Sequence, residues 1–198
     1  MTGKFDNWND RDIGDVIDAY PMAAIAAHDG DFHMTDMPVL LERNADGRPT
    51  ALLGHLPRHA PIYPVLNKDS RCLLSFHGPS AYISPAMAGK SDWAPTWNFV
   101  VVRIAAEIAF SDELTDEALV RTVAHMEQNE QTPWTIDSLG PRYAKLRSGV
   151  IGFRARILSI SARFKLGQDE SDETFSHILG ALKDDALVRW MKRMRDRA

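Results

Sequence analysis

The chain contains 198 residues, of which 44% are hydrophobic and 25% are charged, as expected for one soluble globular domain. Its formal net charge of −4 argues against broad, sequence-independent binding to nucleic acid, because such binding neutralises many phosphates with Lys and Arg. Cys72 is the single cysteine, which excludes an intramolecular disulfide and favours a reducing compartment. The polar N-terminus has no signal-peptide core, and no apolar run is long enough to span a bilayer, so we expect a cytoplasmic protein.

The first half of the chain reads as one helix followed by strands. Apolar residues at helical spacing predict a helix over about Asp10–Tyr20, which Pro21 ends. Three prolines limit the segment from Pro57 to Asn67 to one or two helical turns. Short runs with strand-forming residues, separated by Gly, Asp and Pro turns, predict five strands, namely Met22–Ala27, Phe32–Arg43, Thr50–Leu56, Arg71–Phe76 and Phe99–Phe110.

The second half reads as helices around one more strand. We predict helices over about Asp112–Gln131, Ser138–Leu146, Asp172–Leu182 and Asp185–Arg197, with a long strand over Val150–Ser161. Short, closely spaced strands favour an antiparallel barrel over alternating strand–helix units. We therefore expect a mainly β (β+α) fold in a single domain, residues 1–198. It should carry an N-terminal helix, an inserted helical segment and a C-terminal helical appendage from about residue 171.

The connection between the fourth and fifth strands is dense in Pro, Ser, His and aromatic residues. It contains Phe76–Pro85 and, shortly after, Ala94–Phe99. Loops carried by a rigid sheet commonly display binding groups, so we interpret this connection as a binding loop. The alternative is a structured Pro-rich loop that only closes the barrel.

Arg58 and His59 lie side by side at the end of the third predicted strand. A guanidinium group there can bind a phosphate oxygen in forked geometry, and the imidazole can add a donor; the alternative is a solvated surface arginine. His55 and His59 are four residues apart, but Pro57 between them breaks the helix that a metal site would need, and we predict no metal site.

Other residues could form the slot that a flat aromatic ligand needs, which is apolar with a few fixed polar groups. Apolar walls could come from Met37, Pro38, Phe76, Tyr82 and Trp97. Hydrogen bonds could come from Thr35, Ser84 and Asn98. Together with Arg58 and His59, this set suits FMN, which has an apolar ring edge, a polar pyrimidine edge and a terminal phosphate.

These motifs together resemble the PaiB-like family of FMN-binding split-barrel proteins, often labelled negative transcriptional regulators. The matching pieces occur in the family's order between about Met22 and Leu182. They are His55-Leu56 with Arg58, Phe76–Pro79, Ala81–Pro85, Pro95–Phe99, Gly149–Phe153, and Lys165-Leu166 with Gln168.

The resemblance implies a split β-barrel homodimer with FMN bound at the subunit interface. By similarity, the segment from Thr35 to Pro38 lines the flavin ring and the Arg58 turn holds the phosphate. Trp97 and Asn98 would approach from the partner subunit, whereas Lys165 and Gln168 would cap the site or the dimer contact.

The chain also departs from the family's pattern. Pro57 stands where a small residue usually precedes the arginine, which removes one amide donor. Ala86–Gly89 follow where a Trp-Tyr pair is usual, and Asp169 adds a carboxylate that is unfavourable near a phosphate.

We expect a flavin-dependent or flavin-sensing protein of oxidoreductase type, in which the flavin does the redox chemistry. The sequence identifies no catalytic residue; His77 is the best candidate for a general base. One alternative is a transcriptional regulator that contacts DNA through the basic, amphipathic helix Asp185–Arg197, although the same helix could simply dock its apolar face on the barrel. A weaker alternative is a haem-binding split barrel, with His33, His55 or His77 as axial ligand.

Overall fold

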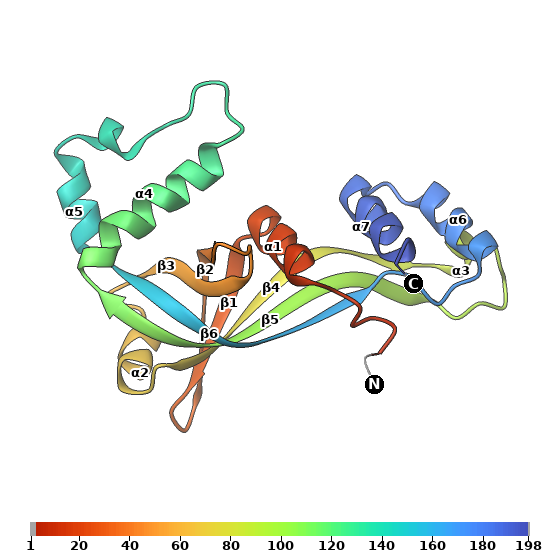
Figure 1. Cartoon of the computed structure of the whole chain (residues 1–198), viewed down its shortest axis with the longest axis horizontal. Helices are drawn as coiled ribbons and strands as arrows, with labels where there is room; N and C mark the ends of the chain where they lie inside the picture. The colour runs from red at the N-terminus through yellow and green to blue at the C-terminus, as the bar shows by residue number, and fades with distance from the viewer. Residues whose placement is uncertain (1–2, 198) are drawn as a thin grey trace.

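The computed structural model describes residues 3–197, and their core is a closed six-stranded antiparallel barrel. Its strands follow the order β1-β2-β3-β6-β5-β4, and β4 pairs back to β1 to close it (Figure 1). The strands are β1 (Met22–His28), β2 (Phe32–Arg43), β3 (Pro49–Pro57), β4 (Arg71–Ile83), β5 (Thr96–Ser111) and β6 (Val150–Lys165). The mainly β fold expected from the sequence is confirmed.

The segment predicted as a loop is mostly paired strand, so the loop assignment was wrong. β4 and β5 continue through it, with Ala81 opposite Asn98 and Tyr82 opposite Trp97. A register shift between His77 and Ser80 accommodates Gly78 and Pro79, because a bulge is one of the few places where a sheet tolerates proline. The true connection is only residues 84–95, with the single-turn helix α3 (Pro85–Ala88) inside it.

Most of the helices lie at the two ends of the molecule's long axis (Figure 1). At one end lie α4 (Glu113–Glu127), the short turn η1 (Ile136–Leu139) and α5 (Arg142–Ser148). At the other lie α3, α6 (Asp172–Ala181) and α7 (Asp185–Arg195). The remaining helices are α1 (Asp10–Ala19), which an Asn9 capping box begins, and α2 (Ile62–Lys68), the two turns expected after Pro57. Among the described residues, no helix is long and apolar enough to cross a membrane.

Helix α4 packs on β6 through small residues. Thr115, Ala118 and Thr122 are the buried positions of this helix. Gly152 of β6 has no side chain, so the first turn of α4 can approach the strand closely. The Gly152 backbone N–H donates a hydrogen bond to Thr115 Oγ1 at 3.0 Å. Met126, near the end of the helix, is exposed. The helix therefore approaches the sheet closely and keeps larger apolar side chains at its margin.

Helix α7 closes the core at the opposite end. Its residues Leu187, Trp190, Met191 and Met194 are buried in the same cluster as the barrel interior. Arg193 and Arg195 of this helix, and Arg197 just beyond it, form ion pairs inside the chain. Arg193 pairs with Asp12 at 2.6 Å and with Asp15 at 2.5 Å, Arg197 also pairs with Asp12, and Arg195 pairs with Asp172. The docking interpretation of this helix therefore agrees with its packing.

Candidate functional site

The predicted site residues of β2 and β3 meet where these two strands separate. Their ladder ends at the pair Val39 and Gly54. Beyond it, Thr35 and Met37 pair only with β1, while His55 and Leu56 pair with β6. Thr35, Met37 and Pro38 are half-buried along one side of this opening, and His55 is half-buried along the other. We call these four residues together with Arg58, which lies just beyond them, the split-edge group.

Arg58 lies in the turn that follows β3. Its backbone N–H donates to the Gly149 carbonyl at 2.9 Å, which ties the turn to the start of β6. Its guanidinium group forms an ion pair with Asp112, and Arg147 lies 3.8 Å from the same carboxylate. His59, the neighbouring donor predicted from the sequence, is exposed. Sequence reasoning missed Asp112 and Arg147, because no local pattern connects them to Arg58.

Two predicted site residues, Leu56 and Phe76, are fully buried in the barrel core. Their side chains support the wall from inside and present no surface to the solvent. The apolar surface expected from Phe76 is therefore left to Met37, Pro38 and the exposed aromatic residues.

The imidazole of His55 has a buried Nδ1 with no hydrogen-bond partner among residues 3–197. An unpaired polar atom in this position is costly unless a ligand meets it. Burial also lowers the pKa of His55 below its ordinary value, because desolvation disfavours the charged imidazolium.

This shift predicts a pH dependence of stability. In the unfolded chain His55 titrates near the ordinary histidine pKa of 6.5, so below that pH the unfolded state binds more protons than the folded state. The free energy of unfolding should fall as the pH drops from 6.5 through the lower folded pKa. Measured by urea unfolding, the free energy of unfolding of His55→Gln should decline less steeply with falling pH than that of the wild type. The exposed His59→Gln control should decline as steeply as the wild type. Equal declines in all three proteins would contradict the assignment of this pH dependence to His55.

A second group of predicted residues lies at the far end of β4, β5 and β6. Tyr82 and Trp97 are about half exposed, 48% and 54%, and their rings meet edge to face at 6.1 Å between centroids. Asn98 is only 2% exposed, and its Nδ2 contacts the sulfur of Met191 at 3.6 Å. Ser84 caps α3 by accepting from the Met87 N–H at 3.3 Å. We call Tyr82, Trp97, Asn98 and Lys165 the hairpin group.

Lys165 and Gln168 have different surroundings. The Lys165 ammonium donates to Thr96 Oγ1 and, at 3.2 Å, to the Trp97 carbonyl. With Asn98 and Trp93 it lines a pocket of about 280 Å³, whose other side carries Asp169 and Glu170. Gln168 accepts from Leu166 N–H at 2.8 Å and donates to the Phe164 carbonyl at 2.6 Å. It shapes the turn that ends β6.

The two groups are far apart within one chain. Pro57, next to Arg58, pairs with Val150 at the start of β6, whereas Lys165 is the last residue of that strand. At about 3.3 Å per residue these positions are separated by roughly 50 Å along the strand. One flavin cannot contact both groups of the same chain.

The residues present fit FMN group by group. Arg58 offers a guanidinium group whose partner is an exposed carboxylate, and His55 offers a buried ring nitrogen that lacks a partner within residues 3–197. Tyr82 and Trp97 offer exposed aromatic surface. Against the fit stand Asp112, which pairs with Arg58, and Asp169, which lines the same pocket as Lys165, since carboxylates repel a phosphate.

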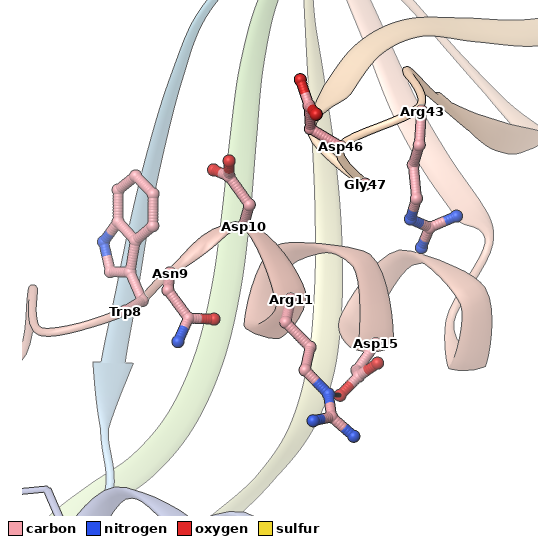
Figure 2. Close-up of a pocket in the computed structure, with 8 residues that line it drawn as sticks. All are labelled: Trp8, Asn9, Asp10, Arg11, Asp15, Arg43, Asp46 and Gly47. Atoms are coloured by element: carbon pink, nitrogen blue, oxygen red, sulfur yellow. Dashed lines mark ion pairs between the residues drawn. The ribbon is translucent and has the colours of Figure 1, made fainter.

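A larger groove of about 680 Å³ lies between α1 and the turn from β2 to β3 (Figure 2). Its lining includes Trp8, Arg11 and Arg43 but none of the predicted site residues. Arg11 lies 3.9 Å from Asp15, and Arg43 pairs with Asp18 at 2.5 Å. The cations of this groove are therefore already matched by carboxylates of α1.

The three histidines considered as haem ligands, His33, His55 and His77, lie on three different strands, β2, β3 and β4. His33, in β2, lies 2.9 Å from Asp29 near the β1–β2 turn. His77 contacts Ser75 Oγ at 3.2 Å on β4. Among residues 3–197, no group of three or more His, Cys, Asp or Glu side chains is arranged to hold a metal ion.

Solved structures with the same fold include flavin-binding proteins. The FAD and heme binding protein from Mycobacterium smegmatis matches with a TM-score of 0.60 and 14% identity, over 85% of this chain and 77% of that one. A flavocytochrome from Azotobacter vinelandii matches with a TM-score of 0.57 and 16% identity, over 86% and 74%. At these identities the likeness shows the fold alone, a split barrel.

Sequence comparison is more specific. The Protease synthase and sporulation protein PAI 2 of Bacillus subtilis (strain 168) is 26% identical over 137 residues. The match covers 68% of this chain and 65%, slightly less than two thirds, of that protein. The family model described as "Putative FMN-binding domain" matches residues 1–159, which include the split-edge group and most of the hairpin group. FMN is therefore the cofactor indicated for this chain, which belongs to the PaiB-like family of FMN-binding split-barrel proteins.

Proposed function

We propose that the chain forms a homodimer that binds FMN as a flavin-dependent or flavin-sensing protein of oxidoreductase type. FMN would bind at two equivalent sites in the subunit interface, which we call seams. Each seam would combine the split-edge group of one protomer with the hairpin group of its partner. The observation that carries this proposal is the separation of the two groups along β6, because each supplies only part of a flavin site. A twofold axis brings unlike ends of two identical chains together.

The outer face of the barrel supports a second copy as the partner. Met34 of β2 and Leu73 of β4 are exposed, and both pair with Ala26 of β1. Met22, four residues earlier on β1, faces the same side and is exposed as well. Exposed apolar side chains on one face commonly mark an interface; between them on this face lie Ala24, Asp36 and Ser75.

In such a site each residue has a defined task. Arg58 would hold the phosphate by forked hydrogen bonds. Thr35 and Met37 would line the ring edge, His55 Nδ1 would face the ligand, and the partner's Trp97 would exclude water from the other side. The bound flavin would supply the electron-transfer chemistry, while the protein would bind and orient it.

A flavin titration tests this function. We expect the wild-type chain to quench FMN fluorescence on binding, and Arg58→Gln to weaken the affinity about 10- to 100-fold, because a charge-assisted hydrogen bond contributes roughly 1.5–3 kcal/mol. Arg58→Lys should retain part of the affinity, since it keeps the charge but loses the fork. Absence of FMN binding by the wild type would refute the proposal.

Mixing two defective chains tests the shared seam. Arg58→Gln and Trp97→Ala should each bind FMN poorly alone. After unfolding and refolding together, a mixed dimer contains one seam with an intact Arg58 and an intact Trp97, so about a quarter of all seams should recover for a symmetric dimer. No recovery, although native mass spectrometry shows mixed dimers, would place both groups outside a common site.

A further inference from the structure

We propose that Asp112 occupies, before flavin binds, the position that the flavin phosphate takes, and that Arg147 binds this phosphate together with Arg58. The inference rests on the proposed flavin function and adds two residues to its phosphate site. It also makes Asp112 an internal competitor of the ligand.

The geometry places one carboxylate between two guanidinium groups. Asp112 Oδ1 accepts from Arg58 Nη2, and Arg147 Nη1 lies 3.8 Å from the same oxygen. The two arginines come from different elements, the turn after β3 and the end of α5, and the hydrogen bond from Arg58 N–H to the Gly149 carbonyl holds these elements together. Guanidinium groups bind carboxylates and phosphates through the same forked geometry, so a site that holds Asp112 also suits a phosphate.

Arg147 is already oriented for this role. Its Nε donates to both carboxylate oxygens of Asp116, at 3.0 and 3.1 Å, and its Nη2 donates to the Asp112 carbonyl at 2.8 Å. The Tyr143 hydroxyl donates to Asp116 and, with Arg147, lowers the pKa of that carboxyl group. These contacts leave Nη1 directed toward the shared anion. Because the side chain is held in advance, binding a phosphate costs little additional side-chain entropy.

Asp112 is easy to displace from this position. Its side chain is 63% exposed and makes no capping hydrogen bond to the first turn of α4. Ion pairs of such exposed groups contribute little to stability. A phosphate dianion carries more charge and more acceptor oxygens than a carboxylate. When flavin binds, its phosphate should therefore replace Asp112 as the partner of both arginines, and the Asp112 side chain should turn to solvent.

The experiment compares FMN with riboflavin, which has the same ring but no phosphate. Asp112→Asn should tighten FMN binding about 5- to 20-fold, through loss of the competing ion pair and of repulsion toward the phosphate. Arg147→Gln should weaken FMN binding about tenfold or more. Neither change should alter riboflavin affinity by more than about twofold. Glu113→Gln, an equal charge change at the next exposed residue, is the control and should leave both affinities near wild type.

The outcomes separate this inference from the proposed function. If FMN binds but Asp112→Asn leaves its affinity unchanged, or tightens riboflavin equally, the inference is overturned and the flavin function stands. Misfolding cannot imitate the expected result, because Asp112→Asn is predicted to gain affinity. If no flavin binds, inorganic phosphate is the probe: it should raise the melting temperature of Asp112→Asn more than that of Asp112→Asn/Arg147→Gln. Equal shifts there would overturn the phosphate site as well.

Discussion

Replacement of Asp12 by Asn should lower the free energy of unfolding by about 3 kcal/mol, because loss of the buried carboxylate leaves Arg197 without its anion and Arg193 with only the exposed Asp15. The Asp12 side chain is 0% exposed and pairs with both Arg193 and Arg197 of the C-terminal segment. In the variant these two guanidinium groups lose their shared anion and face each other across a neutral amide. The asparagine can still accept the capping hydrogen bond that the Asn9 N–H gives to Asp12, so the loss reports mainly the ion pairs.

Asp172→Asn is the matched control. Asp172 pairs with Arg195, but its side chain is 97% exposed, and exposed pairs contribute at most about 1 kcal/mol. Urea unfolding followed by circular dichroism at neutral pH should show a large shift of the midpoint for Asp12→Asn and almost none for Asp172→Asn. Similar midpoints for the two variants would contradict a structural role for the buried carboxylate.

Replacement of Gly152 by Ala should lower the free energy of unfolding by about 2–4 kcal/mol, because it overpacks a contact made by backbone atoms. A Cβ at this position would overlap the Leu114 carbonyl carbon and lie 2.5 Å from the Thr115 nitrogen. No side-chain rotation can relieve that overlap. The first turn of α4 must move off β6 and also lose the hydrogen bond from Gly152 N–H to Thr115.

Gly180→Ala provides the comparison. Gly180 lies inside α6, and a Cβ there meets nothing within 4 Å. This substitution should leave stability unchanged or raise it by up to about 1 kcal/mol, because alanine loses less conformational freedom in a helix than glycine does. Thermal unfolding of both variants measures the difference. A Gly152→Ala protein as stable as Gly180→Ala would show that α4 does not pack where the structure places it.

The barrel could be predicted from the sequence because its evidence is local. Alternating apolar runs and turn residues marked all six strands, and Pro21 correctly ended the first helix near Ala19. The error lay between Phe76 and Phe99, where prolines were interpreted as loop. Cross-strand pairing of Tyr82 with Trp97 overrides that local signal, and the bulge after His77 absorbs Pro79 without ending the strand.

The candidate site was predictable only in part. Arg58 was found because it follows a strand and resembles a family motif. Asp112 contacts it from 54 positions away in the sequence, and Arg147 joins from a further element. No spacing rule identifies such a cluster, since it exists only once β3, α4 and α5 have packed together.

The link between Asp12 and the last helix sets an order on folding during synthesis. During synthesis Asp12 leaves the ribosome about 180 residues before the arginines that neutralise it. Until then the Asp12 carboxylate of α1 lacks these cationic partners and favours hydration, and the part of the core that α7 buries remains uncovered. Completion of the native state therefore waits for translation of α7 and Arg197, however early the barrel strands collapse.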